Sequence, residues 1–169
     1  MATVLKTNGG YGFWVVAQED TVVNKIKNIL VAIDLYAGSE KVAAVAAGFA
    51  EAFSAKLYFL HVERANPTII GDPDLPDERE VVASQVRTSH QELQDLRDKM
   101  TPPGVEAVAL QIQGQTVQKI ISEAVKLDID LIVVGFHRDR LHHLLAGDVT
   151  KSVLSHAPCP VVVVRQPKR

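Results

Sequence analysis

The stretch Leu131-Ile132-Val133-Val134-Gly135, followed twelve residues after its glycine by Gly147-Asp148-Val149-Thr150, decides the fold class. The apolar run predicts a buried strand that ends at Gly135, and Gly147 is expected to open a helix. A strand–loop–helix passage of this kind is typical of a phosphate cradle, because free N–H groups and the helix dipole attract negative charge. Two residues oppose that role. Arg138 stands where a tight loop favours glycine, and Asp148 places a carboxylate at the expected helix start.

Outward from this stretch, continuous apolar runs alternate with helical periodicity along most of the chain. Strands are predicted at residues 29–33, 56–62, 105–112, 129–134 and 161–164, and helices at 42–53 (after Ser39 as N-cap), 78–100, 114–127 and 148–155. This alternation predicts an α/β fold, a single doubly wound parallel sheet with helices on both faces. Ligands of such sheets bind at the carboxyl ends of the strands, at the topological switch point. The candidate positions are therefore Asp34, Val62 and Gly135 onward.

Composition limits the class of protein. The 169 residues suffice for one domain with a core, and a net charge of −2 gives no basic surface for nucleic acid. The single cysteine, Cys159, excludes an internal disulfide and fits a reducing cytoplasm. No apolar run reaches the roughly eighteen residues of a membrane span, and no signal peptide is evident. A cytoplasmic protein with no nucleic-acid or membrane partner is expected.

Four passages, in their order and spacing, carry a resemblance to a known family. They are Ile29–Asp34, Leu60–Val62, Asp128–Gly135 and His156–Val164. With them the chain resembles the universal stress protein family. The resemblance implies five parallel strands in the order 3-2-1-4-5, an adenine-nucleotide alpha-hydrolase-like fold. The domain would span residues 25–166, after an N-terminal arm of residues 1–24 and before a tail of residues 167–169. Arg165 and Gln166 are expected to be solvated along with that tail.

Two kinds of member exist in the family. One kind binds ATP through Gly-x-x-Gly, nine residues and then Gly-Ser or Gly-Thr, and the other kind lacks this pattern. Here Gly135 matches the first glycine, Arg138 replaces the second, the spacing to Gly147 is one residue shorter, and Asp148 replaces the hydroxyl residue. The segment His137-Arg138-Asp139 resembles the loop of the second kind. The resemblance therefore leaves open ATP or another adenine nucleotide, with Mg²⁺, or an empty site.

If a nucleotide binds, the resemblance places its contacts at the strand ends and at the last helix. The base would lie against Ala32, Ile33 and Val62, and Asp34 would accept from the ribose or adenine. The alternative for Asp34 is a carboxylate that caps the following turn. The sugar and phosphates would meet Val134, Gly135, Gly147, Asp148, Val149 and Thr150, with Arg138 pairing with phosphate.

The sequence offers little for catalysis. It holds no Gly-x-Ser-x-Gly elbow and no Gly-x-x-x-x-Gly-Lys phosphate loop. His137, His142 and His143 are interpreted as solvated loop residues, His61 as a satisfied, partly buried imidazole, and Cys159 as a small apolar core residue. We expect a stress-response regulator that senses an adenine nucleotide. The alternatives are a dimeric interaction module without a ligand and a slow nucleotide hydrolase with Asp148 as its base.

The last strand, Val161–Val164, is expected at the edge of the sheet. A bare, valine-rich edge favours pairing with another chain. Family members commonly pair this strand with its symmetry mate, so the resemblance implies a homodimer. The apolar segment Phe13–Val16 is expected either to exchange onto the partner or to pack on its own subunit. A further protein partner stays unidentified.

Overall fold

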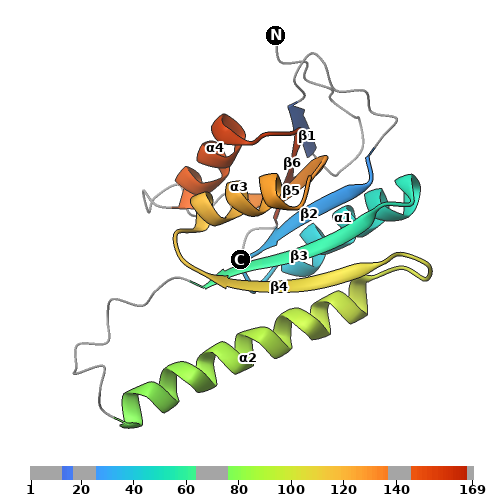
Figure 1. Cartoon of the computed structure of the whole chain (residues 1–169). Coiled ribbons are helices and arrows are strands. Elements are labelled where there is room, and N and C mark those ends of the chain that lie inside the picture. The colour runs from blue at the N-terminus through green and yellow to red at the C-terminus, as the bar shows by residue number, and fades with distance from the viewer. Residues whose placement is uncertain (1–12, 17–25, 64–75, 137–145, 167–169) are drawn as a thin grey trace.

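The computed structural model describes residues 13–16, 26–63, 76–136 and 146–166 (Figure 1). Within them one sheet of six strands runs in the order β1-β6-β5-β2-β3-β4. The strands are β1 (Phe13–Val16), β2 (Asn28–Ile33), β3 (Lys56–Glu63), β4 (Ala107–Gln113), β5 (Leu131–Phe136) and β6 (Val161–Arg165). The helices are α1 (Ser39–Phe53), α2 (Pro76–Met100), α3 (Thr116–Lys126) and α4 (Ala146–His156).

The last five strands are parallel and confirm the predicted fold class. Counted among themselves along the chain, β2 to β6 lie in the order 3-2-1-4-5. The central strand β2 pairs with β3 on one side and with β5 on the other. Its residues Ile29, Leu30 and Val31 are fully buried, as expected for a strand covered on both faces.

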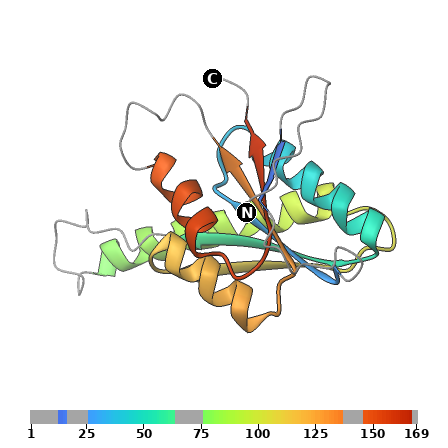
Figure 2. The ribbon, with the colours of Figure 1, turned by 90° about the horizontal axis from the view of Figure 1, so that it is seen from above.

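Helices cover both faces of the sheet (Figures 1 and 2). Helices α1 and α2 contact each other on one face, and α3 and α4 contact each other on the other. Because side chains alternate along a strand, neighbouring residues enter different cores. Phe59 lies in the core beneath α1 and α2, whereas Leu60 lies in the core beneath α3 and α4. These are called below the α1/α2 face and the α3/α4 face. No helix in the described segments is long and apolar enough to cross a membrane.

Several predicted boundaries were wrong. Strand β5 continues through Gly135 to Phe136, because Gly135 pairs with Val164 of β6. Helix α4 begins at Ala146, so Gly147 lies inside it rather than before it. The N-cap of α1 is Gly38 at φ +104°, a left-handed conformation that glycine adopts without strain, and Ser39 is the first helical residue. Helix α2 begins at Pro76, which suits a first helical turn because proline lacks the N–H that would have no partner there.

The prediction that β6 is the sheet edge was also wrong. Strand β1 pairs antiparallel with β6, from Phe13 opposite Val164 to Val16 opposite Val161. All four valines of β6 are buried. The segment Phe13–Val16 was expected either to exchange onto a partner or to pack on its own subunit. In this single chain it packs on its own subunit, as strand β1 against β6. The homodimer through Val161–Val164 stays a prediction, and it would require β1 to leave or to exchange.

Candidate functional site

The switch point lies at the carboxyl ends of β2 and β5. After β2 the chain enters α1 on one face, and after β5 it continues toward α4 on the other face. The connections of two neighbouring parallel strands therefore diverge, which is where doubly wound sheets bind their ligands. The residues predicted from the sequence are placed around this point.

The α3/α4 face of this edge is apolar. Ala32, Val62 and Val149 are each half-buried and pack against one core, which also contains the buried Val134. Ala32 and Val134 are direct neighbours in the β2–β5 ladder. Four of the predicted residues thus belong to one core or pack against it. Ile33 is separated from them, because its side chain is buried in the core of the opposite face.

The junction of β5 with α4 is tied by one hydrogen bond. The Thr150 hydroxyl donates to the carbonyl oxygen of Gly135 at 3.2 Å, and Thr150 is buried. This bond holds the first turns of α4 against the end of β5. The first four N–H groups of a helix have no partner within it, so residues 146–149 suit an anion. Gly147 and Asp148 belong to that turn, whereas Arg138 lies outside the described residues.

Asp34 stabilises the turn between β2 and α1. One of its carboxylate oxygens, Oδ1, accepts from the backbone N–H of Tyr36 at 3.2 Å and from the Ser39 hydroxyl at 2.9 Å. The turn contains two residues with positive φ, Leu35 at +58° and Gly38 at +104°. The capping alternative for Asp34 is therefore present in the structure. A contact between Asp34 and a ligand stays a prediction.

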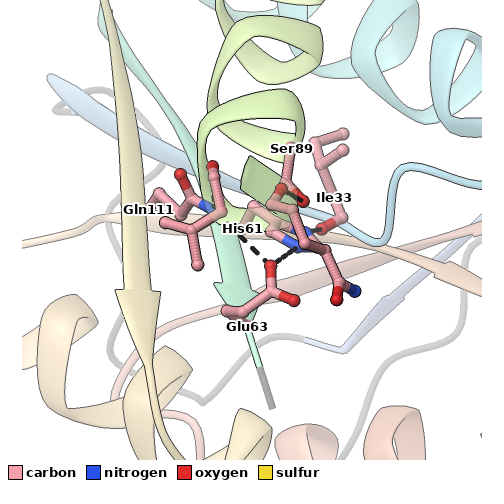
Figure 3. A network of polar contacts seen from close by, with 7 residues as sticks. Ile33, His61, Glu63, Ser89 and Gln111 are labelled. Carbon is pink, nitrogen blue, oxygen red and sulfur yellow. Dashed lines mark hydrogen bonds and ion pairs between the residues drawn. The ribbon is translucent and has the colours of Figure 1, made fainter. Parts of the chain in front are cut away.

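The α1/α2 face of the same edge is polar (Figure 3). His61 contacts the Ile33 carbonyl oxygen through Nδ1 at 2.8 Å and the Glu63 carboxylate through Nε2 at 3.2 Å. The Gln111 amide donates to Glu63 at 3.4 Å and to the Val86 carbonyl of α2 at 3.2 Å. Both nitrogens of His61 have partners, in agreement with the predicted satisfied imidazole. Sequence reasoning did not select Glu63 or Gln111, although polar residues in alternate positions of two adjacent strands were a signal.

An open cavity of about 340 Å³ lies beside this network, between α2 and β4. It is lined by Val86, Arg87, His90, Gln111 and Gln113. Strand β4 is separated from the switch point by β3. We place the candidate site at the switch point, because there the helix start, the glycine of β5 and the apolar group converge.

Comparisons with known proteins agree with this architecture. The model of the universal stress protein family matches residues 25–165. The chain belongs to the universal stress protein family. It is 30% identical to a universal stress protein of Methanocaldococcus jannaschii, over 86% of each chain. It is 32% identical to the universal stress protein A homolog 1 of Coxiella burnetii, over 82% of this chain and 95% of that one.

Solved structures of universal stress proteins share the fold. UspA from Lactobacillus plantarum is 26% identical with a TM-score of 0.63, over 83% of this chain and 99% of that one. A universal stress protein solved in complex with cAMP is 18% identical with a TM-score of 0.54, over 83% of this chain and 98% of that one. One from Archaeoglobus fulgidus solved in complex with dAMP is 22% identical with a TM-score of 0.54, over 83% and 99%. These last two show likeness of fold.

Gln166 is a residue of this universal stress protein that the sequence placed wrongly. It was expected in a solvated tail, but it is only 4% exposed. Its side chain packs against Gly38 and Gly135, on the α1/α2 face of the switch point. No motif pointed to it, since a glutamine after a strand is ordinary in sequence.

Other candidate groups of this family member are structural. Cys159 packs against the core of the α3/α4 face, as predicted, and burial together with the charge of Asp130 raises the pKa of its thiol to about 12. Across the parts of the chain that the structure describes, no three His, Cys, Asp or Glu side chains are placed to hold a metal ion. His137, His142 and His143 lie outside those parts.

Proposed function

We propose that this universal stress protein binds an adenine nucleotide at the carboxyl ends of β2 and β5 and acts as a nucleotide-dependent regulator. The base lies against Ala32, Val62 and Val149, and the phosphate meets the first turn of α4. The sugar lies beside Gly135.

One observation carries the proposal most. Most apolar residues of the central strands are fully buried, whereas Ala32 and Val62 at the carboxyl ends of β2 and β3 are half-buried, as is Val149 in the first turn of α4. An apolar surface at a strand end, next to a helix N-terminus, suits a ligand with a flat apolar ring at one end and an anion at the other.

The charge of the site favours a short phosphate group. Asp148 is in the first turn of α4, and a carboxylate there repels a triphosphate more than a monophosphate. The two solved relatives whose ligands were given above hold cAMP and dAMP, each with one phosphate. We therefore place AMP-like nucleotides ahead of ATP, and Mg²⁺ is needed only if a longer phosphate chain binds.

The experiment is a thermal-shift titration with AMP, cAMP, ADP and ATP, with and without Mg²⁺. A ligand at a hundred times its dissociation constant stabilises the fold by about 2.7 kcal/mol, which raises Tm by several degrees in a domain of this size. We expect the largest shift with a monophosphate. A chain that serves only as an interaction module shows no shift with any of the four, and that result contradicts the proposal.

A matched pair of variants tests where the base lies. Val62→Thr keeps the shape of a half-buried side chain but places a hydroxyl in the apolar group, so nucleotide affinity falls. Val125→Thr makes the same change on α3 at a residue that is 61% exposed, and it leaves affinity unchanged. Equal affinities of the two variants would move the base away from Val62.

A further inference from the structure

The end of β6 places one glutamine side chain at the switch point. The Gln166 N–H donates to the Phe136 carbonyl oxygen at 3.0 Å, which continues the β5–β6 pairing by one residue. The side chain then lies between the end of β5 and the N-cap of α1. With 4% of its surface exposed, Gln166 is as buried as a core residue.

The two glycines around it leave room for the amide. A Cβ on Gly135 would lie 2.6 Å from Gln166 Nε2 and 3.0 Å from Val42 Cγ2. A Cβ on Gly38 would lie 3.1 Å from Gln166 Cδ. The amide thus occupies space that side chains would otherwise fill. Gly135, which matches the first glycine of the family motif, is at the same time the residue against which Gln166 packs.

Among the residues that the structure describes, the buried amide oxygen of Gln166 has no hydrogen-bond partner. Two other polar side chains at the switch point differ in this respect: Asp34 accepts hydrogen bonds from Tyr36 and Ser39, and the Thr150 hydroxyl donates to the Gly135 carbonyl oxygen. Gln111, another glutamine near this edge, has two acceptors for its amide nitrogen. Buried polar groups in native proteins are almost always paired, so a donor from an ordered water or from a bound ligand is expected to meet this oxygen.

We propose that Gln166 determines specificity for the sugar, by accepting a hydrogen bond from a ribose hydroxyl of the bound nucleotide. An unpaired oxygen needs a donor, which a phosphate group in its ionised form lacks and a hydroxyl has. The inference rests on the proposed function, which places the sugar beside Gly135. The last torsion of a glutamine side chain has a broad preference, so the amide turns toward the hydroxyl without leaving its position.

The test compares three nucleotides on the wild-type chain by calorimetric titration: AMP, 2′-deoxy-AMP and 3′-deoxy-AMP. Loss of one neutral hydrogen bond corresponds to about fivefold to tenfold in affinity, so one deoxy analogue is expected to bind that much more weakly than AMP. Equal affinity for all three overturns the inference and leaves the proposed function standing. No binding of any of them overturns both.

Substitutions test whether the Gln166 side chain causes the difference in affinity between AMP and its deoxy analogues. Gln166→Met keeps the length of the side chain and removes the amide, so the ratio between AMP and the weaker deoxy analogue falls to about one. Without ligand, its Tm stays equal to that of the wild type or rises, since an unpaired buried acceptor has been removed. Gln118→Met, at an exposed position of α3, keeps the wild-type ratio. A Gln166→Met chain that still discriminates the sugars overturns the inference, and the wild-type comparison decides alone if this variant does not fold.

Discussion

The two faces of the sheet present different side chains at its carboxyl edge. On the α1/α2 face the last inward positions are polar, with His61, Glu63, Gln111 and Gln166. On the α3/α4 face the positions next to them are apolar, with Ala32, Val62, Ile112 and Phe136. Since neighbours along a strand point to opposite faces, one strand supplies both kinds of side chain. The edge is thereby divided into an apolar half and a polar half.

The two faces also differ in the size of their cores, and the core of the α1/α2 face contains more buried residues. The prediction with the largest expected loss of stability tests this difference. Phe59 and Leu60 are adjacent in β3, both buried, and enter opposite cores. We expect Phe59→Ala to lower the free energy of unfolding by about 3–5 kcal/mol and Leu60→Ala by a smaller amount, within about 2–5 kcal/mol. Urea unfolding measures both, with the exposed Val125→Ala as a control near zero. A greater loss for Leu60→Ala would reverse the ranking of the two cores.

A second prediction concerns the contact of Gly135 with Gln166 on the α1/α2 face. Gly135→Ala should cost about 1–3 kcal/mol of stability, because the added Cβ meets the amide and Val42. The amide is the far end of a flexible side chain, so the lower part of that range is expected. In a Gln166→Ala background the cost of Gly135→Ala should shrink, which a double-mutant cycle measures. The same cost in both backgrounds would show that the two residues do not interact.

A third prediction concerns the bond that ties α4 to β5 on the α3/α4 face. Thr150→Val removes the donor to the Gly135 carbonyl oxygen and should cost about 1 kcal/mol. Thr88 of α2 also donates to a backbone carbonyl, that of Ser84, but it is exposed. Thr88→Val is therefore the matched control, with the same change in helix propensity and a smaller loss of stability in urea. Equal losses of stability in the two variants would mean that the hydrogen bond from Thr150 to Gly135 does not stabilise the fold.

The fourth prediction concerns Cys159 on the α3/α4 face, whose ionisation has the smallest effect on the free energy of unfolding at neutral pH. Its folded pKa of about 12 lies above the ordinary value of 9.0, so the folded state holds the thiol proton more tightly than the unfolded chain. The resulting stabilisation is complete below the ordinary thiol pKa and is lost as pH rises toward 12. The free energy of unfolding of the wild type should fall across this alkaline range more steeply than that of Cys159→Ala.

Thiol reactivity checks the same point without unfolding the chain. At about pH 8, where part of an exposed thiol is ionised, a disulfide reagent should react slowly with the folded protein and quickly in denaturant. Fast reaction of the folded chain would show that Cys159 is not held in the core.

Local signals in the sequence were sufficient for the elements and their order. Continuous apolar runs such as Leu131–Val134 indicate strands buried on both faces, and their alternation with amphipathic helices predicts the parallel sheet. The ends of the strands could not be predicted as well, because they depend on hydrogen bonding to the neighbouring strand. Gly135 remains in β5 since Val164 lies opposite it, and this partner is distant in sequence.

The sequence by itself determined the α/β class, the strand order through its family resemblance, and the set of strand-end residues on which the proposed ligand site rests. Only the tertiary structure decided that β1 covers β6, that Ile33 faces away from Ala32 and Val62, and that Gln166 is buried between two glycines. The physical reason is the range of the interactions. Periodicity and turn residues act over a few positions along the chain. The burial of the Gln166 amide and of strand β6 depends on contacts between segments far apart in sequence, and a local sequence pattern does not predict such contacts.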